Sequence, residues 1–321
     1  MIVPTPESLL HGLLLPLGSL IVFMSLSLLV ANVLEAMNWT RFLARLAAPL
    51  VRLGRFKDVS GASFSLAFVS GMAANTVLAE SYERGTLSRR ELILANLFNS
   101  MPTYFLHLPT MFSLAAPFLG SVATLYVGLT FFAAILRTAG VVLAGRLLLP
   151  PIPDGCVVCR LDEQKPRTPQ EALARGWRLF RRRIRKVVLI TAPIYTVMYF
   201  ARIWGVFEAM ETFLATHVGD LGFLPPQALS IVAFHLVAET TSGLAAAGAV
   251  LQGGELPARV VVLALLVGNI LSSPMRAFRH QFPYYAGIFK PSMAARLIMY
   301  SQLLRAASIA LVTAGFAFFT S

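Results

Sequence analysis

The sequence predicts an all-α integral membrane protein built from two inverted repeats that contain re-entrant or broken helices. Hydrophobic residues make up 57% of the 321 residues, and several apolar runs exceed about 18 residues, long enough to cross a bilayer. The formal charge of +12 comes from basic residues in loops and at segment ends, which is typical of membrane topology and not of nucleic-acid binding. We expect the lipid bilayer as partner and several passes through the cell (inner) membrane.

Composition divides the chain into three regions. Residues 1–150 form the first membrane repeat, with a first span at 9–36 and an interfacial helix at 38–57 that sets arginines against apolar side chains. Residues 151–186 are the only sizeable polar insert and are predicted as a basic cytoplasmic loop and helix. Residues 187–321 form the second membrane repeat. Under this topology both termini lie outside the cell.

A re-entrant segment at 61–80 organises the first repeat. Ser70, Gly71 and Asn75 interrupt its apolar run, and basic residues flank both of its ends, so both ends are expected in the cytoplasm. Irregular backbone survives at membrane depth only where protein or a watery cavity supplies hydrogen bonds. The sequence therefore predicts a cavity beside this segment.

A capped helix with a polar stripe follows, as an outward span at roughly 88–114. Ser88 and Glu91 have the spacing of a capping box, in which each side chain bonds the other residue's backbone N–H. Polar residues then recur every three or four positions along one helix face: Asn96, Asn99 or Ser100, Thr103 and His107. This stripe should face polar or wet surroundings. The next span, 119–150, returns inward.

The second repeat shows the same order of features. After a span at 187–213, the apolar stretch 226–251 is interrupted by Glu239, Thr240, Thr241, Ser242 and Gly243. A helix at 257–280 carries a second stripe: Asn269, Ser272 or Ser273, Arg276 and His280. A last span at 292–319 completes the repeat. Free amides at the breaks, near Asn75 and Thr240 to Ser242, could hold a substrate; the alternative is simple capping of the broken helices.

Short matches relate the two halves. G-T-L-S-R-R begins at Gly85 and G-E-L-P-A-R at Gly254, 169 positions later, while I-L-R-T-A and L-L-R-A-A place Arg137 and Arg305 168 positions apart. Each half has an odd number of spans, so the halves should be inverted, as in secondary transporters. The alternative is chance similarity between helices rich in small residues.

These motifs resemble the Gate domain, also called the nucleoside recognition domain. The family includes the membrane part of ferrous iron transporter B, concentrative nucleoside transporters and spore maturation proteins A and B. The matching residues are the Ser-Gly-containing segment 68–80, the G-T-L-S-R-R-E hinge, and N-S-M-P followed by His107, with an echo at 239–280. The resemblance implies a transport-like membrane fold without fixing the substrate. The chain lacks a G-x-x-x-x-G-K-[ST] nucleotide loop, and its spans lack the cysteine expected near a ferrous path.

The sequence gives little support for a metal site or for a catalytic site. His235 and Glu239 lie four residues apart, a spacing that suits a metal or a proton relay, whereas the simpler alternative is a hydrogen-bonded pair that stabilises the break. Cys156 and Cys159 are too few for a zinc site on their own, so reduced loop thiols are the simpler reading. No catalytic motif is present. We therefore predict no enzyme, no metal and no cofactor.

Arginines within apolar spans need partners, because a charge at mid-depth is costly. Arg137 and Arg305 could donate to carbonyls freed at a helix break or pair with Glu80 or Glu239. Alternatively, they could bind an anionic group of a substrate, since a guanidinium grips carboxylate or phosphate with two parallel hydrogen bonds.

The predicted function is a transporter or permease that moves a small polar or charged solute through a central cavity between two interrupted helices. The alternative is a non-transporting membrane scaffold or assembly factor of the spore-maturation type. The sequence leaves the substrate and any homo-oligomer open. The candidate substrate-binding residues are Ser70, Asn75, Asn96, Asn99, Ser100, His107, Arg137, His235, Glu239, Thr240, Thr241, Ser242, Asn269, Ser272, Ser273, Arg276, His280 and Arg305.

Overall fold

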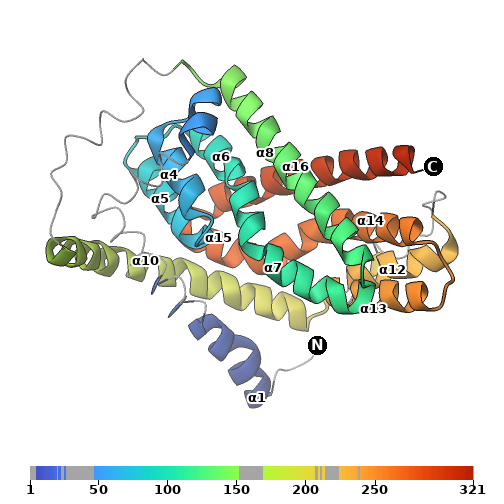
Figure 1. Ribbon diagram of the computed structural model, residues 1–321. Helices are drawn as coiled ribbons and strands as arrows, with labels where there is room; N and C mark the ends of the chain where they lie inside the picture. Colours follow the sequence, from blue (N-terminus) through green and yellow to red (C-terminus); the bar gives the residue numbers. More distant parts are fainter. Residues whose placement is uncertain are drawn as a thin grey trace.

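The computed structural model describes residues 5–19, 21–22, 25–26, 47–151, 169–206, 209, 212–213, 224–237 and 239–320. Within these ranges the chain is helical and contains no strand. Helices of the first half, in blue to green, lie against helices of the second half, in yellow to red (Figure 1). The N-terminal residues form α1 (Pro6–Leu9) and a π-helix η1 (Leu10–Leu14).

The first half contains five helices within residues 58–148. They are α4 (Asp58–Leu66), α5 (Gly71–Glu83), α6 (Arg89–Phe98), α7 (Ser100–Leu119) and α8 (Val122–Leu148).

The second half begins with the long α10 (Pro169–Ile203), which continues without a break from the basic insert into the apolar segment, as the sequence predicted. The helices that follow are α12 (Pro226–Val237), α13 (Glu239–Gln252), α14 (Ala258–Arg276), the π-helix η3 (Ala277–Gln281), α15 (Phe282–Ile288) and α16 (Pro291–Phe319).

Three helical segments among the described residues are long and apolar enough to cross a membrane. They are Val122–Leu148, Ala258–Ile288 and Pro291–Phe319, which coincide with the predicted spans 119–150, 257–280 and 292–319. Large apolar side chains such as Leu147, Leu311 and Phe318 are exposed on their surfaces. These features are those of a helical membrane protein.

Other predicted spans differ from the observed helices or are only partly described. The expected single helix at 88–114 is wrong, because Asn99 leaves the helical conformation and separates α6 from α7. The expected span at 187–213 is helical to Ile203, after which Gly205 adopts a left-handed φ of 71°. Residues 20, 23, 24 and 27–36 of the predicted span at 9–36 lie outside the described residues, as do residues 38–46 of the interfacial helix and the cysteine loop.

Both apolar stretches with polar interruptions are broken helices. Between α4 and α5, residues 67–70 leave the helix, and Ser70 caps α5 by accepting a 3.2 Å hydrogen bond from the Ala73 N–H. In the second stretch, α12 is described as far as Val237 and α13 from Glu239 onward. The sequence placed the breaks too late, because Asn75 lies inside α5 and Thr240 to Ser242 form the first turn of α13.

The two halves use matching packing partners. Helix α6 packs on α4, α5 and α8, and α14 packs on α12, α13 and α16. Helix α7 packs on α8, and α15 on α16. Contacts across the boundary between the halves also correspond. The α7–α13 pair corresponds to the α15–α5 pair, and the α8–α14 pair corresponds to the α16–α6 pair. Helices α8 and α16, which are counterparts of one another, are also in contact. Each of these pairs therefore has a counterpart when the halves are exchanged.

The largest apolar core also lies between the halves. It joins α7 and α8 to α12, α13, α14 and α16, and Tyr126, Leu265 and Leu266 are fully buried in it. A smaller core in the first half stacks Phe98 between Phe56 and Phe64, with ring centroids 4.7 and 4.2 Å apart. Burial of these side chains fixes the helices that surround the candidate site.

Candidate functional site

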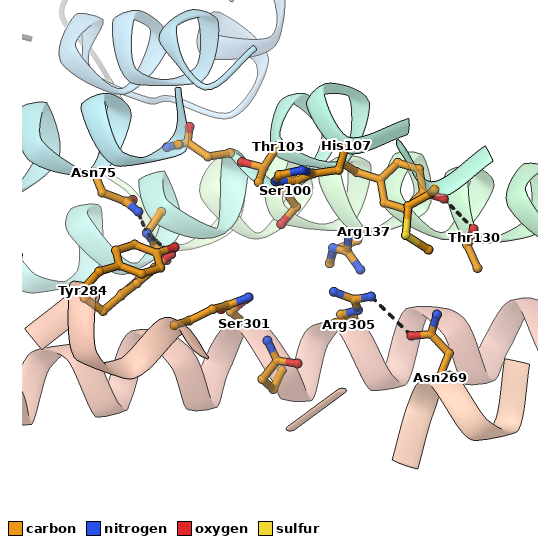
Figure 2. Close-up of a pocket in the computed structure, with 18 residues that line it drawn as sticks. Asn75, Ser100, Thr103, His107, Thr130, Arg137, Asn269, Tyr284, Ser301 and Arg305 are labelled. Carbon is orange, nitrogen blue, oxygen red and sulfur yellow. Dashed lines mark hydrogen bonds between the residues drawn. The ribbon is translucent and has the colours of Figure 1, made fainter. Parts of the chain in front are cut away.

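A polar cavity of about 300 Å³ lies between the two halves (Figure 2). Asparagine amides, hydroxyl groups, a histidine and two arginines line most of it. From the first half come Gly71, Asn75, Asn96, Asn99, Ser100, Thr103, Tyr104, His107, Met111, Thr130 and Arg137, and from the second half Asn269, Gln281, Tyr284, Tyr285, Ser301, Gln302 and Arg305.

The first polar stripe lies along one wall of the cavity. Asn96, Asn99, Ser100, Thr103 and His107 all line it, although the chain passes from α6 to α7 within the stripe. The α-helical spacing of three and four residues survives this change because only Asn99 leaves the regular helix. Ser100, Thr103 and His107 are seen together in Figure 2.

Amide groups organise one end of the cavity. Asn96 Nδ2 donates to Asn75 Oδ1 at 2.8 Å and lies 3.4 Å from the hydroxyl of Tyr285. Asn99 Nδ2 donates to Ser63 Oγ at 2.8 Å, and Ser63 Oγ donates in turn to the Ala74 carbonyl at 3.1 Å. These bonds join α4, α5 and α6 to α15. The asparagines are buried, so their bonded geometry is held rigidly.

The two arginines lie near the opposite end of the cavity, facing one another from α8 and α16 (Figure 2). Arg137 is only 8% exposed, and its Nη1 donates to Ser308 Oγ at 3.2 Å. Arg305 Nη2 donates to Asn269 Oδ1 at 3.3 Å, and Asn269 Nδ2 donates to the Tyr126 hydroxyl at 3.1 Å. Each arginine therefore has a neutral side-chain partner, which for Arg137 comes from the other half of the molecule and for Arg305 from its own half.

Carboxylate partners are absent from this arrangement within the described residues. Glu80, one of the two acids considered from the sequence, instead lies 3.2 Å from Arg84 on its own helix. The side chain of Glu239, the other acid, lies outside the described residues. In the cavity lining, the Tyr104 hydroxyl and Thr130 Oγ1 share a 2.5 Å hydrogen bond that joins α7 to α8.

Several predicted site residues do not line the cavity. Ser70 is occupied as a helix cap. His235 is fully buried among α12, α13 and α14, where its ring fills the space beside Gly243 and Gly268. Thr240 bonds Arg276, and Thr241 and Ser242 follow it in the first turn of α13.

The prediction that the second polar stripe faces the cavity is only partly correct. Asn269 lines the cavity, but Ser272 and Ser273 are buried elsewhere in the helix packing, where Ser273 Oγ donates to Gln302 Oε1 at 2.6 Å. The π-helix η3 widens the turns after Arg276, so the α-helical spacing used for the prediction no longer holds. As a result His280 is exposed and Gln281 lines the cavity instead.

Sequence reasoning missed three polar cavity residues that carried a usable signal, and several that did not. Ser301 and Gln302 precede Arg305 by four and three positions on α16, so a helical stripe could have been drawn through the arginine. Thr130 lies seven positions before Arg137 on α8, which is two helical turns. Gln281, Tyr284 and Tyr285 depend on the π-helix, and no local pattern indicated them.

Comparison with known proteins finds relatives but no assigned function. The chain is 24% identical over 272 residues to the uncharacterized protein MJ0871 of Methanocaldococcus jannaschii, covering 84% of this chain and 83% of that protein. The uncharacterized protein MJ1556 of the same organism is 22% identical over 282 residues, with 87% of each chain covered. A third, MJ0880, is 19% identical over 280 residues, covering 85% of this chain and 88% of that protein. The chain matches no protein-family profile, and no solved structure matches it.

Proposed function

We propose that the protein is a multi-pass membrane transporter in which a small polar or charged solute passes through the cavity between two inverted repeats. The observation that carries the proposal is the position of the cavity. It is polar, it is enclosed by side chains from both halves, and it lies within a molecule whose long helices are apolar outside. Solute sites of transporters with internal repeats lie at such a boundary.

Two further features favour this function. The packing partners of the two halves match helix by helix, which is the pattern expected of an internal repeat. Each half contains a broken helical pair, α4 with α5 and α12 with α13; interrupted helices are a recurrent device of transporters. The resemblance to the Gate domain agrees with this function, and the Gate family is the assignment we propose.

Solvent access to the cavity tests the proposal. Ser100→Cys and Ser301→Cys place one thiol on each wall, in a background where Cys156 and Cys159 are replaced by serine. An impermeant anionic thiol reagent is applied to intact cells and to inside-out vesicles. A transporter exposes its cavity to each side in turn, so we expect both thiols to react from both sides.

The control is Leu143→Cys on the exposed apolar surface of α8, where lipid should prevent the reaction. Uptake of labelled succinate, phosphate and uridine into proteoliposomes provides the companion measurement. Cavity thiols that stay unmodified from both sides, with no uptake of any of the three solutes, would contradict transport and favour a membrane scaffold.

A further inference from the structure

We infer that the cavity binds a small, water-soluble oxyanion, a carboxylate or a phosphate, between Arg137 and Arg305. This inference rests on the proposed function, because it names the class of solute that the transporter would carry. Both guanidinium groups line the same cavity, and no described lining residue is an aspartate or a glutamate. The cavity wall that the structure describes is therefore positively charged.

Electrostatics makes this arrangement unfavourable without an anion. Like charges within a small cavity repel one another, and a buried charge is costly unless a counter-charge or several hydrogen bonds compensate it. Arg137 is almost fully buried, and it lines the same small cavity as Arg305. Their described hydrogen-bond partners, Ser308 and Asn269, are neutral. An anionic ligand supplies the counter-charge that the described wall lacks.

Donor geometry supports the same ligand. A guanidinium has five N–H donors, whereas each arginine uses one nitrogen in its described side-chain bond. The Nε of Arg137 is buried and has no partner among the described residues. Asn269, itself bonded to Tyr126, accepts from Nη2 of Arg305 and so fixes one side of the Arg305 guanidinium. The remaining donors can grip the oxygens of one anion in parallel pairs.

The size of the cavity favours a soluble solute over a phospholipid. At about 30 Å³ for each water in the liquid, the volume of about 300 Å³ corresponds to about ten waters. A phospholipid with two chains is far larger. The neutral amides and hydroxyls at the other end, including Asn75, Asn96 and Tyr284, suit a ligand with polar groups beyond its anionic head.

Ligand binding to the purified protein tests the inference without requiring transport. Apparent melting temperature is measured at constant ionic strength with succinate, inorganic phosphate, uridine, choline and a short-chain anionic phospholipid. We expect a concentration-dependent increase with succinate or phosphate and none with uridine or choline, since a ligand of the folded state raises its stability. Arg137→Lys and Arg305→Lys should abolish the increase, because lysine cannot form the paired contacts.

The matched control is Arg259→Lys. Arg259 is another part-buried arginine on a long helix, but it donates to the Ala317 carbonyl at 3.0 Å and does not line the cavity. This variant should keep the response of the natural protein.

A second measurement needs no variant and so does not depend on their folding. Phenylglyoxal modifies accessible guanidinium groups, and mass spectrometry locates the products. Succinate or phosphate should protect Arg137 and Arg305 but leave Arg259 unprotected.

Equal responses to succinate, phosphate and choline, or an unchanged response in folded lysine variants without protection of Arg137 and Arg305, would overturn the inference. An increase in melting temperature with the phospholipid alone would show that the site binds a lipid headgroup and not a water-soluble anion. If anions bind but the cavity thiols do not react from both sides, the anion site stands and the transport function is rejected. If uridine alone is taken up, the transport function stands and the anion site is rejected.

Discussion

At the scale of single residues, Asn269 holds Arg305 in the cavity wall through a neutral amide. Its amide oxygen accepts from Arg305 and its amide nitrogen donates to Tyr126. An aspartate has nearly the same shape, could still pair with Arg305, and could accept a hydrogen bond from the tyrosine hydroxyl. Asn269 is buried, so an ion pair here would be screened little by salt.

In Asn269→Asp, the new carboxylate should therefore supply the negative charge that otherwise only a bound anion provides to the two arginines. We expect a higher apparent melting temperature without added ligand and a smaller increase on adding succinate or phosphate. Thermal-shift titrations of the purified variant measure both. Gln227→Glu makes the same chemical change on the exposed first turn of α12 and should alter neither quantity. A variant with an undiminished anion response would show that Arg305 does not contact the ligand.

At the scale of elements, the start of α6 combines a cap with an ion pair. Ser88 Oγ accepts from the Glu91 N–H at 3.3 Å, and the Glu91 carboxylate accepts from the Ser88 N–H at 2.6 Å, so the predicted capping box is confirmed. Lys57 Nζ lies 2.9 Å from Glu91 and ties the start of α4 to α6. Burial alone would raise the pKa of Glu91, but the hydrogen bonds from Lys57 and Ser88 outweigh it and hold the pKa below 4.5.

Glu91→Gln should consequently reveal a pH-dependent loss of stability. A carboxyl whose pKa is lowered by folding stabilises the folded state above its unfolded pKa, near 4.5, and loses this contribution as the pH falls through the lowered folded value. The difference in melting temperature between the natural protein and the variant should be constant from pH 5 upward and shrink below it. Ser88→Ala should cost about 0.5–2 kcal/mol at neutral pH. A pH-independent difference for Glu91→Gln would contradict the ionic part of this account.

Close helix packing across the boundary gives a second prediction at this scale. A Cβ added at Gly248 of α13 would lie 2.7 Å from the Phe118 carbonyl oxygen of α7, too close for a backbone atom that cannot rotate away. Gly248→Ala should therefore push the two helices apart and lower stability by about 1–3 kcal/mol. Gly128→Ala on α8 has no atom within 4 Å of the added carbon and should be neutral or stabilising. Thermal unfolding in detergent compares the two, and equal melting temperatures would show that α7 and α13 can separate at no cost.

Local patterns predicted some elements well and others poorly, for physical reasons. Capping at Ser88 and the stripe from Asn96 to His107 depend on neighbours a few residues apart, so the sequence carries the full signal. The second stripe failed after Arg276 because η3 departs from the α-helical period. His235 was a reasonable ligand candidate, but its surroundings are set by Gly243 and Gly268, which come from different helices. Only the fold brings such residues together.

At the scale of the whole molecule, the placement of Arg137 and Arg305 was predictable only in part. Their equivalent positions suggested a shared role, and both do line one cavity. Ser308, the partner of Arg137, comes from the opposite half, and a contact across the boundary has no trace in local sequence. Asn269, the partner of Arg305, comes from a different helix of the same half. The three apolar helices were predictable because composition alone decides them.

Topology supplies the prediction at this scale. The distribution of basic residues predicts that 151–186 lies in the cytoplasm and that both termini lie outside. In intact cells, an impermeant thiol reagent should therefore leave Cys156 and Cys159 unmodified, yet react with Thr320→Cys at the C-terminal end of α16. Permeabilising the membrane should make the two native cysteines reactive and provides the control. Labelling of the native pair in intact cells, with Thr320→Cys protected, would reverse the orientation of the whole protein.

The length of α10 has a mechanical consequence. Its 35 residues extend about 52 Å at about 1.5 Å per residue, which is about 20 Å more than the thickness of a hydrocarbon core of about 30 Å. The basic run 181–186 belongs to the same unbroken helix as Ile194, which packs in one apolar cluster with Tyr285 of the cavity wall. Because one unbroken helix joins the basic run to the cavity wall, we expect a force on the basic end to be transmitted along α10 to Tyr285.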